Sequence, residues 1–249
     1  MPIVIKSDEE IAIMRKAGRC VAQVLQLLVE HVRPGVKEKE LDEIVRREFA
    51  RRGVIPTFLG YKGYPATVCI SVNDEVVHGI PGDRPFQEGD IVSIDLGCTY
   101  KGFVADAAVT VGVGRISPEA QRLIDVTREA LWRGIQAAKA GARVGAIGHA
   151  IQSYVESQGF SVVREYVGHG VGREMHEDPQ VPNYGEPHWG PVLRKGMVIA
   201  IEPMVNMGDW RTRRDPDGWT VRTADGSLSA HFEHTIAITD GEPLVLTLP

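Results

Sequence analysis

An internal repeat constrains the fold of this chain more than any other feature. The segment EGDIVSID at residues 88–95 parallels KGMVIAIE at residues 195–202, and the turn glycines of PGVKEKEL and AGARVGAI, Gly35 and Gly141, match as well. The offsets, from 95 to 202 and from 35 to 141, are 107 and 106 residues. Chance similarity between amphipathic segments is the alternative. The shared order and spacing favour a duplicated helix–helix–strand unit.

The repeat and the size of the chain together predict one domain. The 249 residues are 43% hydrophobic, which is enough for a sizeable core, and no low-complexity linker separates the two copies. We therefore expect a single domain, residues 1–249, made of similar halves at about 1–115 and 116–249.

Helix signals stand at the start of each predicted half. Ser7 with Glu10 three positions later matches a capping box, which predicts a helix over residues 11–31. Ser117 followed by Pro118 begins the helical pattern SPEAQRLIDVTREALWRGIQAAKAG. The segments KEKELDEIVRREFARRG, which ends at its glycine, and GARVGAIGHAIQSYVESQG are predicted as second helices. The remainder of the chain is expected to be strands and loops.

The stretch IVSIDLGCTYKGFVADAAVTV at residues 91–111 is typical of a β-hairpin with one acid in each arm. Because side chains alternate across a strand, Asp95 and Asp106 each lie on the face with smaller neighbours. A turn centred between Tyr100 and Lys101 would place the two aspartates directly opposite each other. A bulge at Gly102 would shift this register by one residue.

Two aspartates that stand directly opposite each other on paired strands repel each other unless a proton or a cation lies between them. Solvated acids on an exposed face are the plain alternative, but Gly97 and Ala108 on the same face leave room for a ligand. A shared proton would suit an acid protease, yet neither Asp95 nor Asp106 stands in an Asp-Thr/Ser-Gly loop. A cation is the interpretation that the residues favour.

A second pair of acids supports this interpretation. Glu202 is the repeat equivalent of Asp95, and Glu233 stands in HFEHTIAIT, a predicted strand on which it shares a face with His231. Four carboxylates around one cavity need more positive charge than one divalent ion provides. Two metal ions with oxygen-rich ligands therefore fit the pattern.

Histidines in glycine- or proline-marked stretches are candidate site residues. His169 lies in YVGHGVGRE, read as a glycine-rich turn, His176 in REMHEDPQ and His78 in VVHGIPGD. A single histidine is more often structural than functional, so each alone is a weak signal. His234 is left out because it points to the strand face opposite Glu233. The segment GHGVG lacks the spacing of a dinucleotide-binding loop, and no GxSxG motif of serine hydrolases occurs.

In this order and context the five candidate metal ligands resemble those of the type I methionine aminopeptidases of bacteria. The resemblance covers essentially the whole chain, through GYPATVCISVNDEVVHGIP, IDLGCTYKGFVADAA, GHGVGREMHEDPQVPNY, GMVIAIEPM and SLSAHFEHTIAIT. It implies the α+β pita-bread fold, with two pseudo-symmetric α/β halves around a curved antiparallel sheet. It also implies removal of the N-terminal methionine from nascent proteins with a small second residue.

The resemblance implies a role for each metal ligand. Asp95 and Glu233 would hold the first ion, Asp106 and Glu233 would bridge to the second, and His169 and Glu202 would complete the shell of the second. The two divalent ions would be Co, Mn, Fe or Zn. A water or hydroxide that bridges the ions would attack the first peptide bond.

The resemblance also implies catalytic and substrate-binding residues. Glu202 would act as general base, His176 would contact the carbonyl oxygen of the substrate, and His78 would contact the scissile nitrogen. Further residues match the methionine pocket of the family: Tyr61, Tyr64, Cys69 and Trp219, with Phe58 and Met175 at positions of variable residue type. Phe58 and Met175 are equally typical of an ordinary core.

Two other classes share this fold. Xaa-Pro aminopeptidases and creatinase-like amidinohydrolases usually carry a large N-terminal domain, for which a helix starting near Ser7 leaves no room. The fold also occurs in binding modules that have lost the metal ligands. The presence of all five candidate ligands and of His78 and His176 argues against that class. The short span from His176 to Glu202 leaves no space for the helical insertion of type II enzymes.

Composition bears on partners and location. The net charge is −5 with no basic run, which argues against nucleic acid or an anionic membrane as main partner. No apolar run reaches the length of a membrane span, and the acidic start is unlike a signal peptide. Three separated cysteines without a CxxC pair fit a reduced cytoplasmic protein. We expect a monomer that acts on nascent polypeptide N-termini and contacts the ribosome.

Overall fold

The structure, a computed structural model, describes residues 2–249, with helices that match the sequence signals closely. The predicted capping box is present, because the Ser7 side chain accepts from the backbone N–H of Glu10 and the Glu10 side chain accepts from that of Ser7. Gly53 ends the second helix with φ 68°, and Ser117 caps the third, which has Pro118 in its first turn. The helices are α1 Asp8–His31, α2 Glu38–Arg52, α3 Pro118–Ala137 and α4 Val144–Ser157, with a 3-10 turn, η1, at Tyr61–Gly63.

Strands of residues 2–249 pair antiparallel throughout, as expected for an α+β protein. The first half contributes β1 Ile55–Pro56, β2 Val68–Val72, β3 Glu75–Val77, β4 Ile91–Tyr100 and β5 Phe103–Gly112. The second half contributes β6 Ser161–Val162, β7 Gly168–Gly170, β8 Glu177–Val181, β9 Val198–Ile201, β10 Met204–Asn206, β11 Thr212–Arg214, β12 Val221–Thr223, β13 Ser229–His231, β14 His234–Ala237 and β15 Leu244–Val245.

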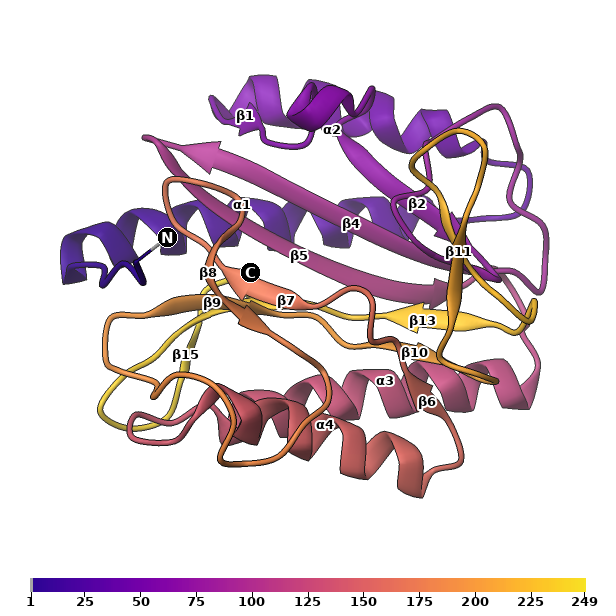
Figure 1. The fold of residues 1–249 in the computed structure, drawn as a ribbon. Coiled ribbons are helices and arrows are strands. Elements are labelled where there is room, and N and C mark those ends of the chain that lie inside the picture. The colour runs from indigo at the N-terminus through magenta and orange to yellow at the C-terminus, as the bar shows by residue number, and fades with distance from the viewer. Residues whose placement is uncertain (1) are drawn as a thin grey trace.

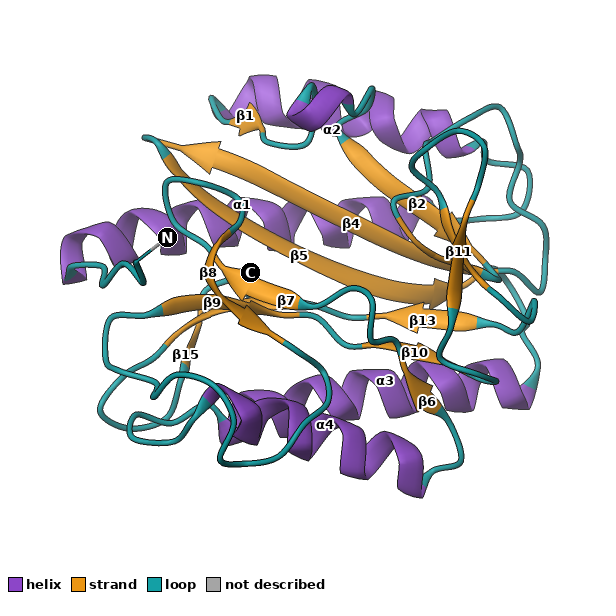
Figure 2. Cartoon of the chain, in the orientation of Figure 1, coloured by secondary structure: helices purple, strands orange, loops and turns teal. Residues whose placement is uncertain are grey.

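Each half has its own helix pair: α1, which passes behind β4 and β5, and α2 lie with the strands of the first half, and α3 and α4 lie at the bottom of the view (Figure 1). Helix α1 packs on β4 and β5 and against α2, and their apolar residues form one core with β2. Helix α3 packs on α4, β13 and β10, and these elements form a second core with β9 and β14. Figure 2 shows the long strands β4 and β5 in front of α1. Each helix pair thus has its own apolar layer, while the duplication of the sequence stays a prediction.

The predicted hairpin forms, but its register differs from the expected one. The turn is centred between Lys101 and Gly102, because Tyr100 pairs with Phe103. Both turn residues have positive φ, 47° and 81°, as in a two-residue type I′ turn. The expectation that Asp95 and Asp106 stand directly opposite is therefore wrong.

Each aspartate is instead paired with a small residue. Asp95 pairs with Ala108, and Asp106 pairs with Gly97, so the two acids are diagonal neighbours on one face. A Cβ added at Gly97 would lie 2.8 Å from a ring carbon of Phe58, so this position admits no side chain. The small-residue face that the sequence indicated thus leaves the carboxylates space in front of the sheet.

The strand expected over HFEHTIAIT is split at Phe232 and Glu233. Strand β13 pairs with β10, whereas β14 pairs with β9. At the break, the backbone of Glu233 bonds in both directions with Ala108 of β5, at 3.0 and 3.3 Å. Glu202, on the facing strand, likewise follows the end of β9 at Ile201. Glu233 thus lies where the strands of the second half meet the hairpin, and Glu202 lies at a strand end.

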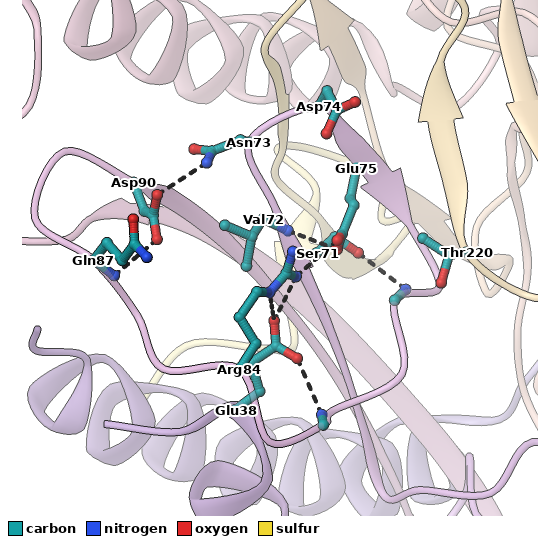
Figure 3. A network of polar contacts seen from close by, with 12 residues as sticks. Glu38, Ser71, Val72, Asn73, Asp74, Glu75, Arg84, Gln87, Asp90 and Thr220 are labelled. Carbon is teal, nitrogen blue, oxygen red and sulfur yellow. Dashed lines mark hydrogen bonds and ion pairs between the residues drawn. The ribbon is translucent and has the colours of Figure 1, made fainter. Parts of the chain in front are cut away.

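A buried polar network fixes the segment between β3 and β4 (Figure 3). The Arg84 guanidinium donates to Glu38 of α2 at 2.9 Å and to Glu75 of β3 at 2.7 Å, and both carboxylates are almost fully buried. Glu75 also accepts from the backbone N–H of Val72, and Glu38 accepts from that of Gly82. Arg84 therefore bridges two buried acids that hold this segment in place, and Arg222 also approaches Glu75 at 3.4 Å.

Replacing Arg84 tests the weight of this network. The Arg84→Ala variant leaves Glu38 and Glu75 buried with one cation fewer, and we expect the free energy of unfolding to fall by about 2–4 kcal/mol. Urea denaturation monitored by circular dichroism measures the change. Lys195→Ala, which removes an exposed ion pair with Asp240, is the control and should stay within about 0.5 kcal/mol. Equal effects of the two variants would refute the assignment.

Candidate metal centre

Four carboxylates from different places in the fold converge beside the imidazole of His169. Asp95 comes from β4 and Asp106 from β5, while Glu202 follows β9 and Glu233 lies at the break between β13 and β14. The ring of His169, from β7, has its Nε2 3.3 Å from Glu202, 3.5 Å from Asp106 and 3.9 Å from Glu233. The five ligands expected from the sequence therefore face one another.

Local hydrogen bonds orient two of these ligands. The Nδ1 of His169 donates to the carbonyl oxygen of Gly170 at 2.8 Å, which directs Nε2 toward the carboxylates. The hydroxyl of Thr235 accepts from the backbone N–H of Asp106 at 3.1 Å and lies 3.1 Å from Asp106 Oδ1. Both ligand side chains are thereby held before any ion binds.

His169 lies in a strand and not in the glycine-rich turn that its sequence indicated. It pairs with Ala200 of β9 and Gln180 of β8 in the middle of a sheet. The flanking glycines serve close strand packing, since a Cβ at Gly168 would lie 2.3 Å from the Ala200 carbonyl oxygen and one at Gly170 would lie 2.2 Å from that of Asp178.

Burial and mutual repulsion perturb the acids strongly. Burial raises the pKa of Asp95 well above its usual value, and the charges of Asp106 and Glu202 raise it further. Burial and the charge of Asp106 raise the pKa of Glu233 in the same way. Burial opposes ionisation of Asp106 too, but the neighbouring His169 outweighs it and lowers the pKa of Asp106. Without cations, some of these acids therefore take up protons.

The residues present fit divalent cations. Within residues 2–249, buried atoms that lack a hydrogen-bond partner include Asp95 Oδ1 and Glu233 Oε1. Ligand atoms of Asp106, His169 and Glu233 lie within 4.8 Å of one another, and so do ligand atoms of Asp95, His231 and Glu233. Carboxylates with an imidazole suit Mn, Fe, Co or Zn. A pair of cations, one in each group of ligand atoms, would provide the partners that the Asp95 and Glu233 oxygens lack.

The acids lie on the wall of a cavity of about 460 Å³ that collects every site residue expected from the sequence. Its lining includes Asp95, Asp106, His169, Glu202, Glu233, His78, His176, Tyr61, Tyr64, Cys69, Trp219, Phe58 and Met175. The cavity brings these side chains together, and their individual roles stay predictions.

Aromatic side chains order the wall beyond the acids. The hydroxyl of Tyr61 lies 2.7 Å from His176 Nδ1, and the His176 ring meets the His169 ring edge-on at 4.4 Å between centroids. Tyr64 donates to the carbonyl oxygen of Val68 or Gly79 and packs edge-on against Trp219. Tyr64 is therefore held by the backbone, and Tyr61 is held by the ring of His176, which lies next to the ligand His169.

His78 is held in a strained backbone conformation at the cavity. Its φ is 63°, in the left-handed region that non-glycine residues rarely adopt. The carbonyl oxygen of the next residue, Gly79, accepts a hydrogen bond from the backbone N–H of Ile70, and a Cβ at Gly79 would lie 2.0 Å from the Ile70 carbonyl oxygen. Such strain is typical of functional sites.

The sequence interpretation missed some lining residues. Tyr166 stacks edge-on against His78, and Lys62 and Arg214 place cations at the rim. His231, buried beside Asp95 and Glu233, was also missed. Its signal was available, because it stands two residues before Glu233 on the strand face that carries the acid.

Comparisons with known proteins agree with this geometry. Residues 12–240 match metallopeptidase family M24. Methionine aminopeptidase 1 of Bacillus subtilis is 53% identical over 238 residues, which cover 96% of this chain and 96% of that protein. A crystal structure of methionine aminopeptidase from Thermotoga maritima superposes with a TM-score of 0.98 and 51% identity, covering 100% of both chains.

More distant structures share the fold but differ in extent. The prolidase of Pyrococcus horikoshii superposes with a TM-score of 0.77 and 27% identity, covering 98% of this chain and 63% of that chain. Together these matches confirm the expected pita-bread fold and favour the methionine aminopeptidases over the Xaa-Pro enzymes. None of the helices within residues 2–249 has the length and apolar character that spanning a membrane requires.

The perturbed histidines predict how stability responds to pH. Burial, helped by the charge of Arg214, lowers the pKa of His78 to about 4. The unfolded chain binds this proton below about pH 6.5 and the folded chain only below about pH 4. The free energy of unfolding of metal-free protein should therefore fall as the pH drops through this window, by up to about 1.4 kcal/mol per pH unit for this group.

The His78→Asn variant isolates this contribution, because asparagine tolerates positive φ and does not titrate. Urea denaturation in EDTA at pH 7, 6 and 5 should give a shallower pH dependence for the variant than for the wild type. Part of the slope should remain, since burial also lowers the pKa of His234 to about 4. Identical slopes would contradict a neutral, buried His78.

Proposed function

Because the chain belongs to metallopeptidase family M24 and releases N-terminal methionine, we propose that this cavity holds two divalent cations and cuts the first peptide bond of new proteins. The observation that carries the proposal is the set of buried carboxylates that face one another with no Lys or Arg of residues 2–249 paired to them, and with orphaned oxygens on Asp95 and Glu233.

Each ligand has a place in the proposed centre. Asp95 and Glu233 would hold the first ion, Asp106 and Glu233 would be shared between the ions, and His169 and Glu202 would complete the second. The distances from His169 Nε2 to Asp106, Glu202 and Glu233 support this grouping. When bound, the cations would supply a water of lowered pKa and would polarise the substrate carbonyl.

Glu202 is the proposed general base. Its side chain is largely buried but opens to the cavity, and burial raises the pKa of its carboxyl above the usual value. A carboxylate with a raised pKa accepts a proton more readily near neutral pH. Its backbone is held by Asn183, which donates to the Glu202 carbonyl oxygen at 3.2 Å.

His176 is the proposed donor to the substrate carbonyl oxygen. Burial and the neighbouring His169 lower the pKa of His176 to about 4, so its ring is neutral at pH 7. If Tyr61 donates its hydroxyl proton to Nδ1, the remaining proton stays on Nε2 and is available to the substrate. A donor at this point stabilises the negative charge that develops on the oxygen. His78, which also lines the cavity, would serve the scissile nitrogen.

An apolar pocket beside these groups would receive the methionine side chain. The residues that would contact it are Phe58, Tyr61, Tyr64, Cys69, Met175 and Trp219. Burial raises the pKa of the Cys69 thiol well above its usual value, so this residue contributes a neutral surface. The preference for a small second residue belongs to the same proposal.

The substrate class indicates where the enzyme works. New protein N-termini are made in the cytoplasm, so we propose that the chain acts there, as a monomer, where nascent polypeptides leave the ribosome. The net charge of −5 does not favour a nucleic-acid surface for this contact. The metal used in the cell would be Mn, Fe, Co or Zn, as the ligand types allow.

Replacing the shared aspartate tests the proposal. Methionine release from a Met-Ala-Ser peptide with added Mn or Co should fall by more than about 100-fold in Asp106→Asn, because one charge that both ions share is lost. Asp125→Asn, at an exposed carboxylate of α3, is the control and should keep full activity.

Two results would count against this account. Near-normal release by Asp106→Asn would overturn the shared-ligand role. A wild-type protein that binds metal but releases no methionine under reducing conditions would favour a binding module on this fold.

A further inference from the structure

We propose that His231 is a ligand of the cation on the Asp95 side, so that each ion of the centre has an imidazole of its own. The inference rests on the proposed function, since it extends the same metal centre. It adds a nitrogen donor to a site that the sequence assigned to carboxylates alone.

The backbone of His231 fixes where its ring points. The residue is the last of β13 and pairs with Met204 of β10. One hydroxyl holds it from both sides, because Thr110 Oγ1 accepts from the His231 N–H at 2.8 Å and donates to the His231 carbonyl oxygen at 2.7 Å. Thr110 lies on the same face of β5 as Asp106, so this clamp directs His231 to the face with the acids.

The ring is buried but has an unsatisfied nitrogen. The His231 side chain is 1% exposed, and its Nε2 has no hydrogen-bond partner among residues 2–249. Glu202 Oε2 lies 3.7 Å from Nε2, which is too far for a hydrogen bond. A buried polar atom without a partner costs free energy, so an absent partner is expected at this point.

The missing partner is best supplied by a cation. A ring nitrogen of His231 and carboxylate oxygens of Asp95 and Glu233 lie within 4.8 Å of one another. Two ligands of one ion, each at about 2.0–2.2 Å from it, stand at most about 4.4 Å apart, so small adjustments close the set. Asp95 Oδ1, Glu233 Oε1 and His231 Nε2 are all orphaned, and one cation would satisfy all three.

The second group of ligand atoms has the same composition. Asp106, His169 and Glu233 also combine two carboxylates with one imidazole, and Glu233 belongs to both groups. A nitrogen ligand on the Asp95 side would shift the preference of that ion from Mn toward Co or Zn.

Cobalt-loaded protein allows the imidazoles to be counted. An imidazole bound to paramagnetic Co(II) gives a strongly shifted ring N–H signal in the proton NMR spectrum. With two equivalents of Co(II), the wild type should show two such signals, one from His169 and one from His231. His231→Gln should lose one signal, and calorimetry should show at least about tenfold weaker binding of one equivalent.

A matched control uses the neighbouring histidine. His234 is half-buried, and its Nδ1 lies 2.7 Å from the hydroxyl of Thr247. His234→Gln should keep both shifted signals and both affinities. Loss of a signal in both variants would show a general disturbance of the strand and would overturn the assignment.

The outcomes separate this inference from the proposed function. If wild-type protein shows one shifted signal with both cobalt ions bound, or if His231→Gln keeps both signals and both affinities, His231 is not a ligand. The wild-type spectrum decides this even if the variant does not fold. The proposed metal centre itself fails if the wild type binds no cobalt, or if Asp106→Asn binds cobalt as the wild type does.

Discussion

Repulsion among buried carboxylates is the constraint on which this structure depends. Asp95, Asp106, Glu202 and Glu233 face one cavity with His169, and His231 is buried beside them. No Lys or Arg of residues 2–249 forms an ion pair with the four acids. Burying such charges without compensation costs several kcal/mol for each. The arrangement is stable at neutral pH only if protons or cations provide the missing positive charge.

The repelling carboxylates lie where the two halves of the fold meet. Glu233 stands where the strands of the second half meet the hairpin of the first, through its backbone bonds with Ala108. A cation held by Asp95 and Glu233 would therefore link the two sides of the molecule. In this account metal binding stabilises the fold as well as the reaction, because ligands from both halves are held together.

Local chemistry explains what the sequence could predict. Helix ends were readable because caps such as Ser7 and Ser117 act within one turn, and the acids were readable because strand alternation placed Asp95 and Asp106 on the small-residue face. Both rest on neighbours in the chain.

Tertiary contacts explain the rest. The hairpin register depends on Lys101, the first turn residue, adopting positive φ. The sequence does not predict this conformation, because glycine stands only at the second turn position, Gly102. The break at Glu233 arises because its backbone pairs with Ala108, 125 residues earlier in the chain, and His169 extends because flanking glycines let neighbouring strands approach. The sequence showed that His231 shares a strand face with Glu233, but a single histidine is a weak signal, and its unsatisfied nitrogen beside Asp95 is seen only in the structure.

The central claim is that the buried acids exist to hold two cations that share ligands. Anomalous diffraction from crystals grown with Mn or Co, recorded at the absorption edge of the metal, measures this directly. The account predicts two peaks in the cavity, both within bonding distance of Glu233. No peak among these carboxylates, or two peaks without a common ligand, would contradict it.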